Sequence, residues 1–215
     1  MYRFGTYIDI KRLEGSFCVE NFHYTNSSTQ ASCLRLGLEK SFLKGNSSMK
    51  KLIIVNGTMG VGKTTTCKLL YKHFSKSIWL DGDWCWMMNP WDFNEENKEM
   101  VKRNIIFLLR SFLDNSNFEY VLFSWVIHRN DIMEWILDEL KDYNLQIYRF
   151  SLVCSEKELE RRMLLDGRSS DSIKESIDRN KLYYGMDTIK IDTNDKSPDD
   201  VVSEIKKLIH VSNEY

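Results

Sequence analysis

Residues 57–64 read Gly-Thr-Met-Gly-Val-Gly-Lys-Thr, which is the pattern G-x-x-x-x-G-K-T of a phosphate-binding loop, or P-loop. The glycines let backbone N–H groups surround an anion. Lys63 adds a positive charge near the β- and γ-phosphates, and the Thr64 hydroxyl can bind Mg²⁺. ATP and Mg²⁺ are therefore the expected cofactors. The residues expected to bind the nucleotide through this loop are Gly57, Thr58, Met59, Gly60, Val61, Gly62, Lys63, Thr64 and Thr65.

The sequence on both sides of the loop supports this interpretation. Residues 51–56 are a short apolar run typical of a buried strand, and residues 65–72 have the spacing of a helix. The phosphates would then lie at a helix N-terminus, where free N–H groups and the helix dipole favour an anion. A chance glycine turn with a surface lysine would lack this order of strand, loop and helix.

Length and charge limit the classes of protein to consider. The 215 residues suit one α/β domain, with room for an appendage, and can bury a sizeable core. Thirty basic and 31 acidic residues leave a net charge of −1, with no basic stripe for nucleic acid or an anionic membrane. We therefore expect no nucleic-acid and no membrane partner.

Apolar runs and cysteines indicate the compartment. No run is long enough to span a bilayer, and the N-terminus lacks the apolar stretch of a signal peptide. The five cysteines are odd in number and never spaced C-x-x-C, which favours reduced thiols over disulfides or a zinc site. These features predict a cytoplasmic protein.

Two segments differ in composition. Residues 1–48 are rich in Ser, Asn, Gly and Thr with weak periodicity, whereas Met49 begins the sequence expected at the start of a P-loop protein. We expect residues 1–48 to be a dispensable or poorly ordered extension, as would follow from a misassigned upstream start. The alternative is a small structured cap. Residues 49–215 would form the P-loop domain.

From residue 49 onward, strand and helix patterns alternate, which predicts a parallel sheet with helices on both faces. The fold class is therefore a three-layer α/β/α sandwich with a five-stranded parallel sheet. Strands are predicted over residues 51–56, 77–80, 120–123, 146–153 and 188–192. Further helices are predicted after Asn94, over 131–141, over 172–184, and after Ser197. Ser155-Glu-Lys-Glu158 is predicted to be a capping box that begins another helix, which would end at a break over 166–170.

A second informative stretch is Leu80-Asp-Gly-Asp83, at the end of the second predicted strand. Ligands of open parallel sheets bind beyond the carboxyl ends of the strands, so this pair should face the same crevice as the P-loop. We expect Asp83 to orient or deprotonate an acceptor hydroxyl, and Asp81 to serve the metal or the acceptor. The alternative is an ordinary surface turn.

Arginines surround the helix break at 166–170, where a short lid is expected to exclude water. Arg168 lies within the break and is the preferred closing residue, with Arg162 second. Ordinary solvated helix charge explains at least one of Arg161 and Arg162, because adjacent residues point in different directions. Arg179 lies on the following helix and could reach the acceptor.

Aromatic residues crowd the stretch after the acidic pair. Trp84 and Trp86 follow Asp83 directly, so one of them could stack on a planar acceptor, although core packing explains some of the rings in this stretch. His128 is interpreted as a structural side chain or a neighbour of the lid, because no Ser or Cys partner for a nucleophile is evident.

Residues 49–210 resemble the small P-loop kinases related to shikimate kinase. Residues 56–65 match that group's pattern G-x-M-G-x-G-K-[ST]-T, and residues 178–183 with 189–193 match its closing pattern. The resemblance implies that Arg179 is a substrate-binding arginine. It also implies that the loop at Thr193 lies at the adenine, so Thr193 and Arg162 join the expected nucleotide contacts.

Other stretches are similar to other members of the group. Asp81-Gly-Asp83 resembles adenylylsulfate kinase and gluconate kinase, and residues 123–129 resemble the third strand of gluconate kinase, which also carries a serine, here Ser124, in place of an acid. The G-G-G segment and the R-P-L-L lid of shikimate kinases are absent, so the chain is not expected to act on shikimate. Residues 84–88 also replace the H-P-x-x-N of gluconate kinase.

These observations predict an ATP-dependent phosphotransferase of a small molecule, with Lys63, Asp83 and Arg168 as catalytic residues and Trp84 and Arg179 on the acceptor. The aromatic stretch favours a nucleoside, a nucleotide or an aromatic compound over a sugar acid. The alternative is an ATP-binding regulatory or resistance protein without turnover, which Ser124 in place of the acid would suit. The sequence leaves the acceptor and the oligomeric state open.

Overall fold

The computed structural model describes residues 49–211, with side chains from 49 to 210. The expectation of an extension over 1–48 lies outside the described residues, as do residues 212–215.

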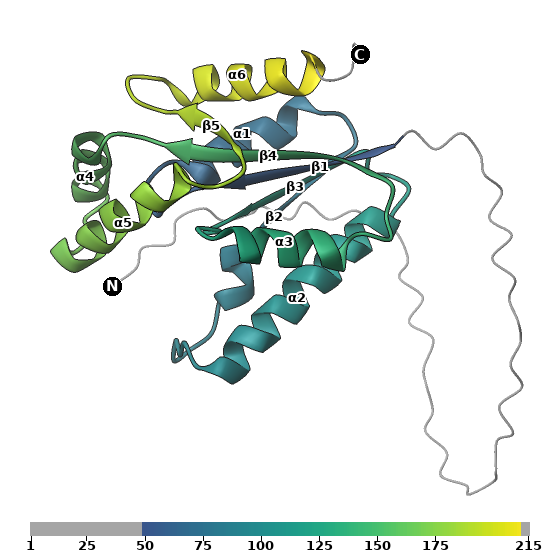
Figure 1. The fold of residues 1–215 in the computed structure, drawn as a ribbon, viewed down its shortest axis with the longest axis horizontal. Coiled ribbons are helices and arrows are strands. Elements are labelled where there is room, and N and C mark those ends of the chain that lie inside the picture. Colours follow the sequence, from purple (N-terminus) through teal and green to yellow (C-terminus); the bar gives the residue numbers. More distant parts are fainter. Residues whose placement is uncertain (1–48, 212–215) are drawn as a thin grey trace, which may run out of the picture. The chain divides into compact units, whose positions relative to one another are not determined.

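The described residues form one five-stranded parallel sheet, which confirms the predicted fold class (Figure 1). Its strands follow the order β2-β3-β1-β4-β5, and every neighbouring pair is parallel. Each strand lies within two residues of its predicted bounds. The strands are β1 (Lys50–Asn56), β2 (Ser77–Asp81), β3 (Tyr120–Trp125), β4 (Leu145–Val153) and β5 (Ile189–Asp192).

Helices cover both faces of the sheet. The helices α1 and α6 lie on one face, α2 and α3 lie on the other, and α4 and α5 lie beyond the carboxyl ends of the strands (Figure 1). The helices are α1 (Lys63–His73), the 3₁₀ helix η1 (Gly82–Trp86), α2 (Glu95–Asp114), α3 (Asn130–Glu139), α4 (Glu156–Leu165), α5 (Ser170–Tyr183) and α6 (Pro198–Val211). Within residues 49–211, none of these helices has the length and apolar character needed to cross a membrane.

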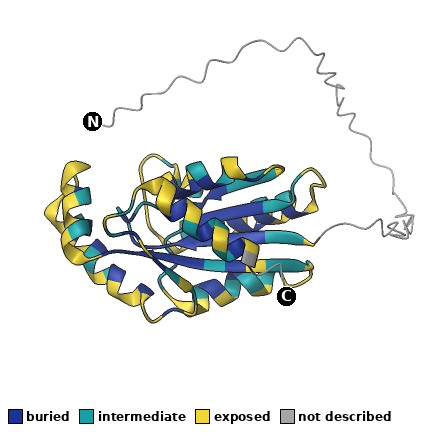
Figure 2. Cartoon of the chain, turned by 90° about the horizontal axis from the view of Figure 1, so that it is seen from above, coloured by how far each residue is buried: buried dark blue, intermediate teal, exposed yellow. Residues whose placement is uncertain are grey.

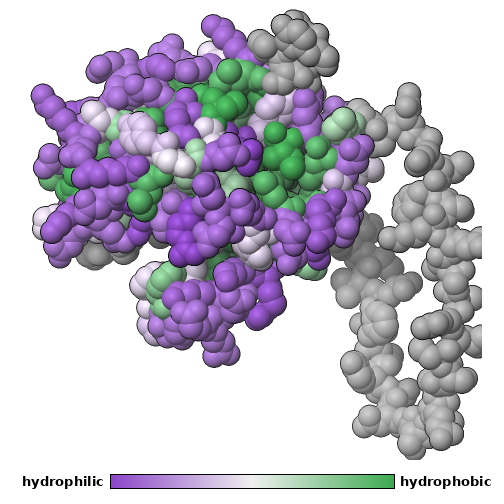
Figure 3. All heavy atoms as spheres, in the orientation of Figure 1, coloured by the Kyte–Doolittle hydropathy of each residue, from purple (hydrophilic) through white to green (hydrophobic). Residues whose placement is uncertain are grey.

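The central strand β1 is buried on both of its faces, as expected for a parallel sheet. Its alternate side chains Ile53 and Val55 join the core under α1 and α6, while Leu52 and Ile54 join the core under α2 and α3. Figure 2 shows buried residues along the strands and exposed residues on the outer sides of the helices. The face seen in Figure 3 is mainly hydrophilic, with smaller apolar areas between the polar side chains.

Three of the predicted helix starts are made by side-chain caps. Asn94 Oδ1 accepts from Asn97 N at 2.8 Å, and Ser197 Oγ accepts from Asp200 N at 3.2 Å. Ser155 Oγ accepts from Glu158 N at 3.3 Å, which confirms half of the predicted capping box. The other half is wrong, because Ser155 N donates to Asn194 Oδ1 and Glu158 binds arginines instead.

The strand order brings the candidate residues to one edge. From β1 the chain crosses to β2, and from β3 it crosses back over β1 to β4, so the direction of winding reverses between β1 and β3. Such a reversal leaves a crevice at the carboxyl ends of the two strands. The P-loop follows β1 and the acidic pair follows β2, so both lie at this edge.

Candidate active site

The P-loop forms an open backbone cradle at the start of α1. Gly62, the residue before the helix, has a φ of 108°, a left-handed conformation that side chains with a Cβ rarely adopt. A Cβ built on Gly62 would meet no atom within 4 Å, so the space beside this backbone is open. The loop can therefore present its N–H groups, and those of the first turn of α1, to a phosphate.

Lys63 is held inside this loop. Its side chain is 7% exposed, and its Nζ donates to the carbonyl oxygen of Thr58 at 2.9 Å. Burial lowers the pKa of Lys63, and the carboxylates of Asp83 and Asp81 oppose that effect. The lysine thus has one backbone acceptor and two nearby carboxylates, and its contact with phosphate oxygens stays a prediction.

The loop is also fixed to helix α5. Thr58 Oγ1 donates to the carbonyl oxygen of Ser176 at 3.0 Å, and Ser176 Oγ donates to the carbonyl oxygen of Met59 at 2.6 Å. Thr58 and Ser176 are both buried. Because buried hydrogen bonds are costly to break, these two bonds hold the P-loop against α5.

Thr64 and Asp81 lie together, although 17 residues separate them. The Thr64 hydroxyl donates to Asp81 Oδ2 at 3.0 Å, and Asp81 Oδ1 accepts from Asp83 N at 3.2 Å. A hydroxyl and a carboxylate are the hard oxygen ligands that Mg²⁺ uses. Within residues 49–210 there is no group of three or more His, Cys, Asp or Glu that could enclose a metal.

The serine at the end of β3 is already engaged. Ser124 is fully buried, and its Oγ accepts a hydrogen bond from Trp79 Nε1 at 3.0 Å. Asp81 is the register partner of Ser124 on the neighbouring strand. Strand β3 therefore supplies no carboxylate beside Asp81, and Asp81 is the acid that accepts the hydrogen bond of Thr64.

The glycine between the two aspartates is required by close packing. A Cβ on Gly82 would lie 2.6 Å from Cγ and Cδ1 of Trp125, so an alanine displaces either the ring or η1. We expect Gly82→Ala to destabilise the protein by about 1–3 kcal/mol, the usual cost of overpacking. Thermal unfolding measures this loss.

Gly185→Ala is the matched control for that substitution. Its Cβ would lie 3.7 Å from the carbonyl oxygen of Leu182, an ordinary van der Waals distance. An unchanged melting temperature is expected. Equal stability of the two variants would show that the contact with Trp125 does not restrict Gly82.

Asp83 reaches solvent but has protein around it. Burial raises its pKa, the charge of Asp81 raises it further, and Lys63 opposes both. Its backbone N–H donates to Asp81 Oδ1 at 3.2 Å, and Asp81 Oδ2 accepts from Thr64. The structure thus places Asp81 toward Thr64, and the role of Asp83 toward an acceptor stays a prediction.

Helix α5 adds Arg179 to the same region. The positive charge of Arg179 acts to lower the pKa of Lys63, of His128 and of Tyr183. Its guanidinium forms an ion pair with the exposed Glu175, a type of contact that contributes little stability. The binding of an acceptor by Arg179 stays a prediction.

Two further polar groups near Arg179 were not selected from the sequence as site residues. His128 was interpreted as structural, and its Nδ1 is buried with no hydrogen-bond partner among the described residues. Burial lowers the pKa of His128, and Arg179 lowers it further. Tyr183 is fully buried, and its hydroxyl is likewise without a partner in that part of the chain. The spacing of Tyr183, four residues after Arg179, was the available signal.

The unpartnered hydroxyl of Tyr183 predicts a gain in stability on substitution. Tyr183→Phe removes a buried polar group that forms no hydrogen bond, so we expect the melting temperature to rise by about 2–4 °C. Tyr148→Phe is the control, because Tyr148 is buried and its hydroxyl donates to the carbonyl oxygen of Ile209 at 3.1 Å. Thermal unfolding should show a loss for this second variant. A loss for both would mean that Tyr183 has a partner in solution.

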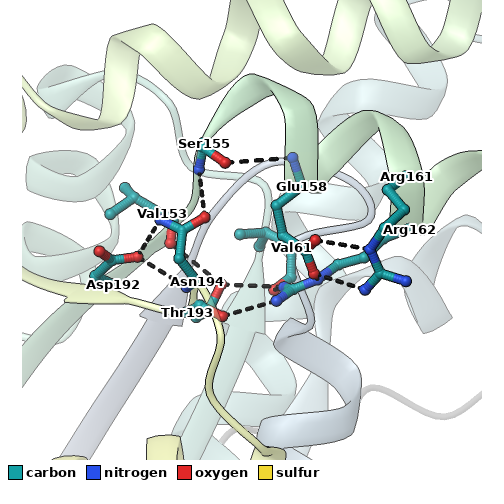
Figure 4. Close-up of polar contacts among 9 residues, drawn as sticks. All are labelled: Val61, Val153, Ser155, Glu158, Arg161, Arg162, Asp192, Thr193 and Asn194. Atoms are coloured by element: carbon teal, nitrogen blue, oxygen red, sulfur yellow. Dashed lines mark hydrogen bonds and ion pairs between the residues drawn. The ribbon is translucent and has the colours of Figure 1, made fainter.

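Arg162 ties the P-loop to the loop after β5. Its guanidinium donates to the carbonyl oxygens of Val61 at 3.1 Å and Thr193 at 2.7 Å, and to Thr193 Oγ1 at 3.0 Å (Figure 4). Glu158 binds the same arginine. Thr193 is buried, and its hydroxyl donates to the carbonyl oxygen of Val153 at 3.2 Å. These contacts fix the loop at Thr193, whose contact with the nucleotide stays a prediction.

The other lid arginines lie on the surface. Arg161 and Arg162 both bind Glu158 and hold the pKa of that carboxyl at about 2 (Figure 4). Arg168 lies in the turn between α4 and α5, is exposed, and has no side-chain hydrogen bond or ion pair to another residue in 49–210. Its role in closing the site stays a prediction.

The aromatic residues after Asp83 divide between core and surface. Trp79 packs against the core under α1, and Trp86 packs against the core under α2. Trp84 is 53% exposed, and its ring centroid lies 5.0 Å from that of Trp79. Core packing therefore explains Trp79 and Trp86 but not Trp84.

Comparison with known proteins gives the family. A family profile described as an AAA domain matches residues 53–182. The chain belongs to the AAA domain family. The match begins within β1 and ends within α5, so it includes the P-loop, the acidic pair and Arg179. No curated protein sequence matches this AAA-domain chain.

Solved structures similar to this AAA-domain chain have the fold of P-loop kinases, as the sequence predicted. The tunicamycin resistance protein of Deinococcus radiodurans is 21% identical with a TM-score of 0.59, over 74% of this chain and 95% of that one. Shikimate kinase of Acinetobacter baumannii is 20% identical with a TM-score of 0.55, over 78% and 96%. A gluconokinase of Sinorhizobium meliloti is 13% identical with a TM-score of 0.54, over 76% and 98%.

Proposed function

We propose that this chain is an ATP- and Mg²⁺-dependent phosphotransferase that phosphorylates a hydroxyl group of a small molecule. The P-loop alone supports phosphate binding. The observation that carries the proposal is the position of Asp83. Its carboxylate is close enough to Lys63 to raise the pKa of that lysine, and it is exposed and so accessible to a second substrate. A nucleotide-binding switch has no need of such a group beside its phosphate loop.

Each residue has a role in this proposal. The loop N–H groups and Lys63 bind the phosphates and stabilise the charge that develops as the terminal phosphoryl group leaves. Asp83 orients the acceptor hydroxyl and accepts its proton. Arg168 closes over the transferred group from the turn between α4 and α5. Catalysis then consists mainly of positioning and electrostatic stabilisation.

Thr64 and Asp81 would hold the magnesium ion, which supplies charge neutralisation at the phosphates when it is bound. Their direct hydrogen bond holds the Thr64 hydroxyl oxygen next to Oδ2 of Asp81. The fully buried Ser124 donates no carboxylate to this site, so Asp81 takes the place of an acid on β3.

Arg179 and Trp84 would bind the acceptor. Arg179 has guanidinium donors beyond its pair with Glu175, so it suits an acceptor that carries a negative charge. Trp84 directly follows Asp83 and exposes about half of its surface, which suits a planar group beside the reacting hydroxyl. These features favour a nucleoside, a nucleotide or an aromatic compound as acceptor, and a cytoplasmic location remains part of the proposal.

A second candidate function is an ATP-binding regulatory or resistance protein without turnover. The residue at the end of β3 favours it, because Ser124 is not an acid that could hold the metal and its hydroxyl is already bound by Trp79. A structural neighbour is named as a tunicamycin resistance protein, which fits a resistance role as well.

Incubation of the full chain with labelled ATP, Mg²⁺ and a panel of metabolites separates the two functions. The proposal predicts acceptor-dependent release of ADP together with a labelled product. Tight ATP binding without transfer to any compound of the panel would support the second candidate and refute the first.

A further inference from the structure

Residues 84–93, here named the aromatic segment, expose an unusual amount of apolar surface. Four of the twelve large apolar side chains that are exposed within the described residues lie in these ten positions. They are Trp84 at 53%, Met87 at 71%, Trp91 at 64% and Phe93 at 55%. The others are scattered over eight positions along the chain, and single exposed apolar residues need no explanation. A concentration of this kind marks a binding surface.

The rings of this segment hold one another in place. Trp91 and Phe93 are stacked, with centroids 5.8 Å apart and planes inclined by 6°. Trp86, which packs against the core under α2, lies 5.2 Å from Phe93 and 6.4 Å from Trp91. Because the buried part of Trp86 anchors the two exposed rings, the surface is formed before a ligand binds, and little entropy is lost on binding.

The 3₁₀ helix η1 links this surface to the proposed acceptor residue Asp83. Asp83 and Trp84 are consecutive residues of η1, and Gly82 of the same helix packs against Trp125 at the end of β3. The aromatic segment runs directly from this helix to the start of α2, where Asn94 forms the cap. Trp86 lies three residues after Asp83, on the same side of this 3₁₀ helix, and it contacts both exposed rings.

A positive charge borders the same rings. Lys98 Nζ lies 4.3 Å above the centroid of Phe93 and also pairs with Glu95. The segment thus has an apolar centre and a polar edge, which is the usual composition of a small-molecule site. It carries no group of basic residues that would suit an anionic lipid surface.

We infer that the aromatic segment binds the apolar part of the acceptor, so the acceptor is an amphiphile with an aromatic or alkyl group attached to its hydroxylated part. This inference rests on the proposed function. It goes beyond stacking on Trp84 alone, because Trp91 and Phe93 become determinants of specificity.

Binding of matched sugars to the full chain tests this inference without requiring turnover. The probes are 4-nitrophenyl β-D-glucoside, octyl β-D-glucoside and glucose, which share hydroxyl groups and differ in the apolar group. Binding is measured by isothermal calorimetry in the presence of ADP and Mg²⁺. We expect the two glucosides to bind at least about 10-fold more tightly than glucose, the size of effect that aromatic contact and apolar burial provide.

Trp91→Ala and Phe93→Ala should each weaken binding of the 4-nitrophenyl glucoside by about 10-fold and leave ADP binding unchanged. Both residues are more than half exposed, so both variants should fold. Phe107→Ala is the matched control, because Phe107 is 71% exposed on α2 outside the segment. It should bind all probes as the unchanged chain does.

Equal binding of all three sugars, or an equal loss in the Phe107→Ala variant, would overturn the inference. So would a dimer of the unchanged chain that Trp91→Ala converts to a monomer with no effect on the probes, since the surface would then join two copies. Selective glucoside binding without phosphoryl transfer to any acceptor would refute the proposed kinase activity, and with it the identity of the ligand as an acceptor, while the aromatic segment would still be a binding surface for an amphiphile.

Discussion

Lys63→Met should lower acceptor-dependent ADP release about 1,000-fold, at the upper end of the effect of removing one charged stabiliser from an active site. The substitution keeps the length and apolar stem of the side chain while removing its charge. Arg162 cannot take the place of this charge, because its guanidinium is bound to the carbonyl oxygens of Val61 and Thr193. The kcat of purified protein at saturating ATP measures the loss.

Lys68→Met is the matched control for this prediction. Lys68 lies on the same helix α1, five residues after Lys63, and is exposed. The control should retain its full kcat, because its charge lies in solvent. Full turnover by the Lys63→Met variant would contradict both the role of the P-loop and the proposed reaction.

The fold followed from the sequence because its signals are local. Strand ends were predicted within two residues since apolar runs and the residues around them mark the strands directly. Asn94, Ser155 and Ser197 cap the helices that they were expected to begin. The strand order could not be predicted in this way. It depends on which long crossovers pack together, and no single residue records that choice.

The site was predictable to the extent that its residues form continuous motifs. The P-loop and the acidic pair were found because their spacing carries the chemistry. The hydrogen bond between Thr64 and Asp81 and the position of Tyr183 beside Arg179 required the folded chain, because each depends on contacts between separate elements. Arg162 was expected near the nucleotide, but its bonds to Val61 and Thr193 join residues far apart in sequence.

Asp83→Asn should lower kcat for acceptor phosphorylation about 100- to 1,000-fold, within the range that general bases contribute. The amide preserves the size of the side chain but cannot accept the proton of the hydroxyl. The KM for ATP should change less than about 2-fold, because the hydrogen bond of Thr64 goes to Asp81 and not to Asp83. Steady-state kinetics with each substrate varied in turn measures both quantities.

Asp81→Asn provides the contrast that assigns the two carboxylates. Its amide oxygen can still accept from Thr64, but the negative charge beside that hydroxyl is lost. The concentration of Mg²⁺ that gives half-maximal rate should therefore rise about 10-fold or more, whereas Asp83→Asn should leave it unchanged. The reverse pattern would exchange the two roles, with Asp83 on the metal and Asp81 on the acceptor. Because Thr64 donates to Asp81 and forms no hydrogen bond with Asp83, the geometry favours the first assignment.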